Sequence, residues 1–129
     1  MDDPVVPVSW GELLDKATIL QIKRARFSSP AALANAEREL AALAPALRRL
    51  APEPEGLAEA RAALAAVNQR LWVIEDKIRE LDARKDFGAE FIALARSVYR
   101  ENDERVRIKR AINTLLGSAL MEEKQYSAY

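Results

Sequence analysis

The stretch LAEARAALAAVNQRLWVIEDKIRELDARK (residues 57–85) decides the fold, because its apolar residues recur at alternating steps of three and four. The repeating positions are Leu57, Ala60, Leu64, Val67, Leu71, Ile74, Ile78 and Leu81. Side chains at this spacing share one face of an α-helix, and an unbroken run of this length is typical of a coiled-coil-like seam. The stretch therefore predicts one long helix that packs against another helix.

A second long helix is predicted at about residues 88–116, after a turn at Asp86-Phe87-Gly88. Its apolar residues keep the same rhythm and are Phe91, Leu94, Val98, Ile108, Ile112 and Leu115. Each helix would be roughly 45 Å long at about 1.5 Å per residue, which exceeds the diameter of a compact domain of this size. We therefore expect an antiparallel helical hairpin whose far end protrudes, bends or is covered by a partner.

Two further helices are predicted at about residues 10–27 and 30–50, which makes the chain an all-α, antiparallel helical bundle. Ser9 followed by Glu12 has the spacing of a capping box, in which each side chain bonds to the backbone N–H near the other residue. Pro45 is expected to kink or end the second helix, because proline removes a backbone donor and clashes one turn back.

The chain is expected to form a single domain over residues 1–129. Residues 1–8 form an extended lead, because the prolines there disfavour a helix. The segment Pro-Glu-Pro-Glu-Gly at residues 52–56 is the clearest linker between helices, and residues 118–129 form a tail.

Composition excludes several classes of site and partner. The chain has no Cys and no His, which excludes disulfide frameworks, thiol chemistry, histidine-based triads and typical zinc sites. Its 20 basic and 20 acidic residues balance, so no global field draws it to nucleic acid. No apolar run approaches the roughly 20 residues of a membrane span, and the start is acidic. We therefore expect a cytoplasmic protein that binds neither nucleic acid nor membrane.

The apolar rhythm breaks in the middle of the fourth predicted helix. Continuing the seam from Val98 places Glu101 and Arg105 where apolar residues are expected, with Asn102 beside them. Unpaired charge is costly to bury, so polar residues at such positions are paired, hydrated or functional.

Residues on neighbouring helices could complete a polar cluster around this break. In an antiparallel hairpin Trp72 lies about level with Asn102, and we expect Glu75 and Arg79 to pair with each other and with Asn102 or Arg105. The cluster has two interpretations, a structural ion-pair network or a ligand site. The candidate ligand-binding residues are Lys16, Asn68, Trp72, Glu75, Arg79, Tyr99, Asn102, Arg105 and Lys109.

No catalytic residue, cofactor or metal site is predicted. Glu12, Asp15 and Asp76 are weak candidates for metal ligands, and with oxygen ligands alone the metal would be Mg²⁺ or Mn²⁺. Glu-rich helices produce such carboxylate spacings by chance.

Four stretches carry a family resemblance: VSWGELLDKATILQIK (8–23), LWVIEDKIRE (71–80), FIALARSVYRENDERVRIKRAIN (91–113) and LMEEKQY (120–126). Together, in this order, they resemble a small family of bacterial helical proteins of unknown function. The resemblance implies an uncharacterised bacterial cytoplasmic protein and carries no assigned activity.

Three functions remain open on the sequence. The first is a non-catalytic helical interaction or adaptor protein that acts as an oligomer, a homodimer formed through the long hairpin. The second is a binder of a small anionic ligand, such as a sugar phosphate or a nucleotide. The third is a Mg²⁺-dependent all-α nucleotide hydrolase, whose carboxylates would lie one helical turn apart. The seam of residues 57–85 and the length of the hairpin favour the first.

Overall fold

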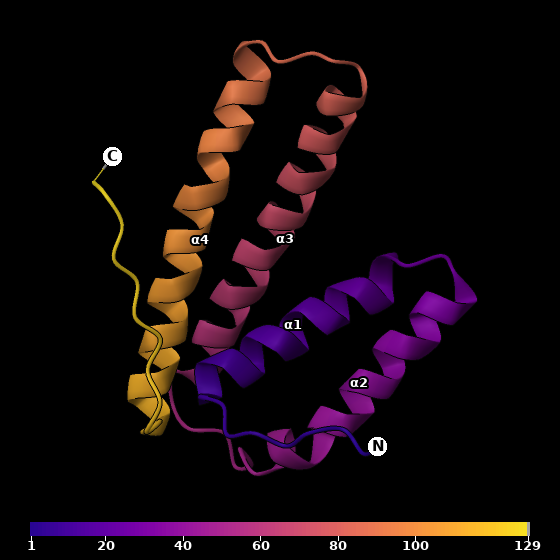
Figure 1. Cartoon of the computed structure of the whole chain (residues 1–129). Coiled ribbons are helices and arrows are strands. Elements are labelled where there is room, and N and C mark those ends of the chain that lie inside the picture. The colour runs from indigo at the N-terminus through magenta and orange to yellow at the C-terminus, as the bar shows by residue number, and fades with distance from the viewer. Residues whose placement is uncertain (129) are drawn as a thin grey trace.

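The computed structural model describes residues 1–128, and this part of the chain is helical without strands. The helices are α1 (Trp10–Arg26), α2 (Pro30–Arg48), α3 (Leu57–Ala83) and α4 (Ala89–Leu116) (Figure 1). The predicted all-α fold is confirmed, and each predicted helix agrees with the structure to within two residues at either end.

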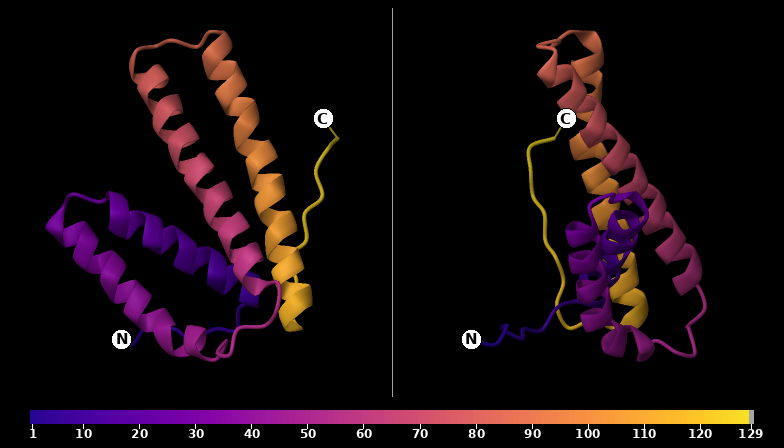
Figure 2. Two further views of the ribbon diagram at one scale, coloured as in Figure 1. Left: turned by 180° about the vertical axis from the view of Figure 1, so that it is seen from behind. Right: turned by 90° about the vertical axis from the view of Figure 1, so that its right-hand side faces the viewer.

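The helices form two hairpins that diverge from a shared base. α3 and α4 pack antiparallel, and α1 and α2 form a second hairpin that leans against their lower part (Figures 1 and 2). Only α1 packs against both α3 and α4, whereas α2 packs against α1. The upper half of the α3–α4 hairpin extends beyond the other two helices, as the length of the predicted helices suggested.

Local chemistry explains where α1 begins and how α2 continues to Arg48. Ser9 Oγ accepts a hydrogen bond from the Glu12 backbone N–H at 3.2 Å, which caps α1. Of the two alternatives predicted at Pro45, the helix end is wrong, because α2 runs past this residue, and the kink stays a prediction. Leu47, which follows Pro45, packs on the core and Leu50 is buried, so apolar contacts hold this end of the helix in place.

The main core lies at the base, where α1, α3 and α4 meet. Its buried residues are Leu14, Leu50, Leu57, Leu64, Val67, Ile108 and Ile112. The seam of α4 runs from Ile112 to Leu116, which packs on this core, and the predicted seam residue Leu115 is exposed. The reason is geometric: a helix with 3.6 residues per turn drifts away from a strict seven-residue repeat.

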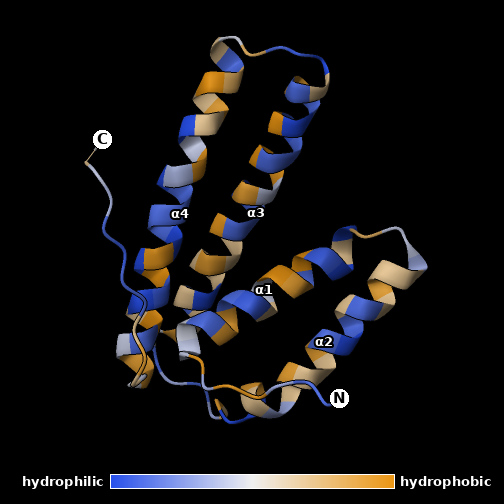
Figure 3. Cartoon of the chain, viewed as in Figure 1, coloured by the Kyte–Doolittle hydropathy of each residue, from blue (hydrophilic) through white to orange (hydrophobic). Residues whose placement is uncertain are grey.

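Above the base the seam is less covered. The apolar residues that face the hairpin axis there are half-buried: Leu71, Ile74, Ile78, Phe91, Leu94 and Val98. Leu81, next to the turn, is buried, but Phe87 and Ile92 are 51% and 56% exposed. Figure 3 shows apolar residues continuing along both helices toward the turn. We call residues 71–98 the protruding segment.

After α4 the chain reverses direction at Gly117, whose φ of +67° lies in the left-handed region that favours glycine. Residues 118–128, which we call the strap, are not helical and run back beside α4 (Figure 2). Within residues 1–128, no helix is long and apolar enough to cross a membrane.

α1 crosses α4 at Gly11, where the two backbones almost touch. The Gly11 N–H donates to Asn113 Oδ1 at 2.6 Å. A Cβ added at Gly11 would lie 2.5 Å from the Lys109 carbonyl oxygen and 2.8 Å from Asn113 Oδ1. Real Cβ atoms do not approach a backbone oxygen so closely, so any larger residue at this position must push the helices apart.

We expect Gly11→Ala to lower the free energy of unfolding by about 1–3 kcal/mol, the usual cost of overpacking a tight site. The measurement is urea unfolding followed by circular dichroism. Gly88→Ala is the matched control, because its added Cβ meets only the exposed side chain of Asp86, at 3.3 Å. Equal stability of the two variants would show that α1 and α4 do not cross this closely.

Candidate functional site

Asp15 of α1 is the centre of the buried polar cluster. This residue is 1% exposed, and its carboxylate accepts hydrogen bonds from Asn68 Nδ2 of α3 at 2.9 Å and from Arg105 of α4. Arg105 Nε lies 2.9 Å from Oδ1 and 3.1 Å from Oδ2, and its Nη2 also donates to Oδ2. One carboxylate therefore links α1 to both helices of the long hairpin.

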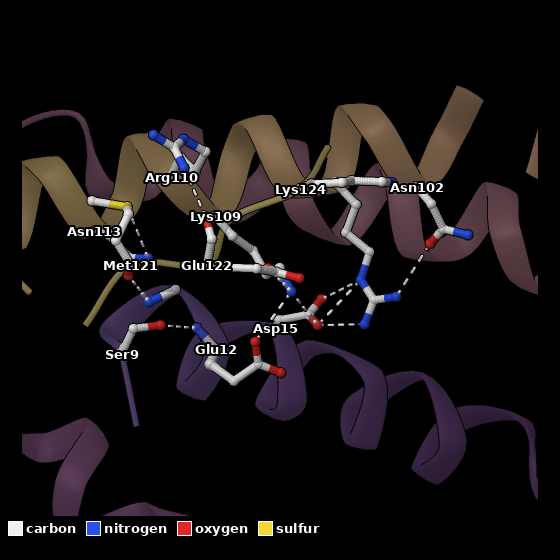
Figure 4. A network of polar contacts seen from close by, with 12 residues as sticks. Ser9, Glu12, Asp15, Asn102, Lys109, Arg110, Asn113, Met121, Glu122 and Lys124 are labelled. Carbon is white, nitrogen blue, oxygen red and sulfur yellow. Dashed lines mark hydrogen bonds and ion pairs between the residues drawn. The ribbon is translucent and has the colours of Figure 1, made fainter. Parts of the chain in front are cut away.

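Lys109 is the second buried charge, one turn further along α4 and 5% exposed. Its Nζ lies 2.7 Å from Glu122 Oε2 in the strap, 3.1 Å from Glu12 Oε2 and 3.9 Å from Asp15 Oδ2 (Figure 4). This contact explains why the predicted capping box is only half formed at Ser9: the Glu12 carboxylate turns to Lys109 instead.

Asn113 ends the row of polar residues on this face of α4. Its side chain is 1% exposed, accepts from Gly11 and donates from Nδ2 to Met121 Sδ at 3.8 Å. The strap is fixed to the same region by Ser118 Oγ, which accepts from the Trp10 N–H at 2.9 Å. Arg105, Lys109 and Asn113 are spaced four residues apart, so their side chains share one face of α4. This face is turned toward α1.

The contacts keep both cations charged. The hydrogen bond to Asp15 raises the pKa of Arg105, against the opposing effect of burial. Burial alone would lower the pKa of Lys109, but its hydrogen bonds to Glu122 and Glu12, with the charge of Asp15, outweigh burial and raise that pKa. The lysine therefore stays an ammonium ion across the neutral range.

Two grooves border this cluster. The first, which we call the Trp72 groove, lies between α1 and the hairpin and has a volume of about 440 Å³. It collects six of the nine candidate residues: Asn68, Trp72, Glu75, Arg79, Asn102 and Arg105. The second, which we call the strap groove, lies between α4 and the strap, has a volume of about 680 Å³ and is lined by Tyr99 and Lys109.

Lys16 does not join the other candidates. Its side chain is 57% exposed and pairs with Glu39 of α2 at 3.2 Å. A one-residue step along a helix rotates the side chain by about 100°, so Lys16 points to α2 while Asp15 points to the hairpin.

The expected pairing across the hairpin also needs correction. Glu75 and Arg79 do pair, at 3.5 Å, but as exposed residues of α3. Arg105 binds Asp15, and its contact to Asn102 Oδ1 is 3.4 Å long. The buried carboxylate of α1 is a better partner than an exposed glutamate because a charge-assisted, bidentate contact compensates desolvation.

Trp72 is half-buried at the far end of its groove. The ring of Phe27 lies 6.3 Å away, and the guanidinium of Arg26 lies 5.7 Å from the Trp72 ring centroid. The end of α1 therefore covers part of the indole.

Sequence reasoning placed Asp15 only among weak metal candidates and missed its central role. Gly11, Asp15, Thr18 and Ile22 lie at steps of four, three and four and are all buried, but only Ile22 is a large apolar residue, so the sequence alone did not mark this face as buried. In residues 1–128 no group of three or more Asp or Glu side chains is arranged to hold a metal ion. Glu12 and Asp15 surround an ammonium ion, and Asp76 lines the Trp72 groove.

The paired charges and hydrogen bonds of this cluster are suited to a structural role. Within the described residues, no buried side-chain nitrogen or oxygen lacks a hydrogen-bond partner. Carboxylates from α1 and the strap match the buried Lys109 and the partly buried Arg105, so the cluster can fix how three helices and the strap are placed.

Comparison with known proteins assigns the family. A model described as a family of unknown function (DUF6165) matches residues 5–129, which include all four helices and the strap. The chain belongs to DUF6165. The resemblance to a family of unknown function is thereby confirmed, and its motifs include both Asp15 and Lys109. No curated protein and no solved structure matches the DUF6165 chain.

We expect Asp15→Ala to reduce the free energy of unfolding by about 3–5 kcal/mol, because it leaves the partly buried Arg105 without its carboxylate. Glu75→Ala removes an exposed pair and should cost no more than about 0.5 kcal/mol. Urea unfolding of both variants measures the difference. Similar small losses from both would contradict a central role for Asp15.

The raised pKa of Lys109 predicts a loss of stability in alkali. A group with a raised folded-state pKa stabilises the fold below its unfolded pKa, about 10.4 for lysine, and loses this contribution as pH rises through the folded value. The stability of Lys109→Arg should therefore fall less steeply than that of the parent above about pH 10.4, because arginine stays charged. Parallel curves from urea midpoints would refute the effect.

Proposed function

We propose that the protein is a non-catalytic helical interaction protein that associates with a second copy of itself through the protruding segment, residues 71–98. The observation that carries this proposal is the change in burial along the hairpin. Leu64 and Val67 are fully buried where α1 covers the hairpin, but Ile74 and Ile78 are only half-buried beyond it.

The physical argument is that two packed helices cover only the sides that face each other. At the base, α1 supplies a third surface, and the core residues there are shielded from water. The end of α1 still covers part of Trp72, but no other helix lies beside the upper half of the hairpin (Figure 1). The edge-to-face pair of Phe87 and Phe91 lies at its tip, with ring centroids 5.1 Å apart. Covering these apolar side chains would contribute about 25 cal/mol for each Å² removed from water.

A second copy is the occupant that fits best. Its hairpin has the same length and the same seam, so two hairpins can pack as an antiparallel four-helix bundle. Such an interface uses the same surface on both chains, the commonest arrangement among soluble oligomers. The net formal charge of zero means that no overall repulsion opposes the association. The cytoplasmic location expected from the sequence is part of this proposal.

The anionic-ligand alternative has less support at the Trp72 groove. The cation nearest the cluster there, Arg105, already holds Asp15 in a bidentate contact. An anion entering the groove would have to compete with that buried carboxylate.

At micromolar concentration, sedimentation equilibrium should give a mass of twice 14.4 kDa. We expect Ile92→Glu to weaken this association by at least about tenfold, because it places a charge in the interface, and to leave the fold intact. Ala111→Glu, at an exposed position on α4 near the base, is the matched control and should still dimerise. A parent protein that sediments only as a monomer, or equal effects of the two substitutions, would refute the proposal.

A further inference from the structure

The strap packs along α4 in a defined register and forms one wall of the strap groove. It runs antiparallel to α4, so that the Ser118 N–H donates to the Asn113 carbonyl at 2.9 Å and Lys124 Nζ reaches Asp103 at 2.6 Å. Successive strap residues therefore meet successive turns of α4, as a bound peptide would.

Two neighbouring cations of α4 hold the acidic part of the strap. Lys109 binds the Glu122 carboxylate at 2.7 Å. Arg110 Nη1 donates to the Glu122 carbonyl oxygen at 2.7 Å and lies 3.2 Å from the Glu123 carboxylate. Three acceptors of one Glu-Glu dipeptide, two carboxylates and a backbone carbonyl, are thus recognised at once (Figure 4 shows Lys109, Arg110 and Glu122).

These contacts set the register of the strap on α4 but contribute little to holding it there. On the strap side of these ion pairs, the Glu122 and Glu123 side chains are 40% and 80% exposed, and the Lys124 side chain is 22% exposed. The apolar residues of the strap, Leu120, Met121 and Tyr126, are exposed as well. Exposed ion pairs stabilise little, and segments with few buried apolar contacts open at low free-energy cost. The strap can therefore leave while the helices keep their packing.

The groove beneath is shaped for more than one small ion. Its α4 wall offers Lys109 at one end, the apolar side chains of Val106 and Val98 further along, and Asp103, which pairs with Lys124 of the strap. A small anion would use only the cations, whereas an extended peptide can place carboxylates on them and apolar or aromatic side chains beyond.

We propose that the face of α4 beneath the strap, with Lys109 and Arg110, is a docking site for an extended acidic peptide of a partner protein, and that the strap covers this site in the free chain. The peptide presents two adjacent carboxylates to Lys109 and Arg110, as Glu122 and Glu123 do. The choice of partner rests on charge complementarity, because this face of α4 already binds a Glu-Glu-Lys segment through paired opposite charges. This site is independent of the association through the protruding segment.

The probe is a fluorescently labelled peptide with the strap sequence SALMEEKQYSA, and the readout is its anisotropy against the full-length chain. Glu122→Gln with Glu123→Gln weakens the chain's own strap, so this double variant should bind the probe at least about tenfold more tightly than the parent. Adding Arg110→Gln to the double variant should weaken binding about tenfold.

Arg79→Gln in the same background is the matched control, because Arg79 is on α3, away from the strap, and pairs with Glu75 of its own helix at 3.5 Å. It should leave probe binding unchanged. A probe that itself carries Glu122→Gln and Glu123→Gln tests the site without altering the wall of the groove, and it should not bind.

Three results would overturn the proposal. One is no binding of the probe to any form of the chain. Another is binding that ignores both Arg110→Gln and the loss of the two glutamates from the probe. The third is a double variant that sediments as a monomer while the parent is a dimer, because the occupant would then be the strap of a second copy and not a partner's peptide.

Discussion

The carboxylate of Asp15 is the constraint on which the arrangement of the two hairpins depends. It is almost fully buried on α1, and its acceptor sites are used by Asn68 of α3 and Arg105 of α4. A buried ion pair does not have to add stability over an apolar core, but its geometry can select one packing over others. Here that selection fixes the position of α1 along the long hairpin, while Gly11 allows the close approach that brings the carboxylate within reach.

Lys109 extends this constraint from the helices to the C-terminal strap. Its ammonium ion lies between Glu12 of α1 and Glu122 of the strap, with Asp15 nearby. Lys109 thus takes part both in a contact between helices, to Glu12, and in a contact to the strap, to Glu122, that the strap can give up. If Glu122 leaves, Glu12 and Asp15 remain beside Lys109, so the lysine keeps neutralising charge and the helices keep their arrangement.

The helix bounds and the long hairpin could be predicted from the sequence, whereas the polar cluster around Asp15 could not. The seam of residues 57–85 is a local, periodic property, so helix bounds and the hairpin follow from it. Which face of α1 meets the hairpin depends on tertiary packing, and this decides whether Asp15 or Lys16 enters the cluster. The strap has no periodicity, so its contacts to α4 carried no signal in the sequence.

The two hairpins diverge from a shared base, so a rotation between them would move their far ends more than their bases. Only α1 packs against both long helices, and its closest approach to α4 is near one end, at Gly11. α3 has 27 residues, which corresponds to an arm of about 40 Å. A rotation of ~6° about the crossing would displace the tip of that arm by ~4 Å. Small changes in packing at the base are thereby amplified into large changes in the distance between the two arms.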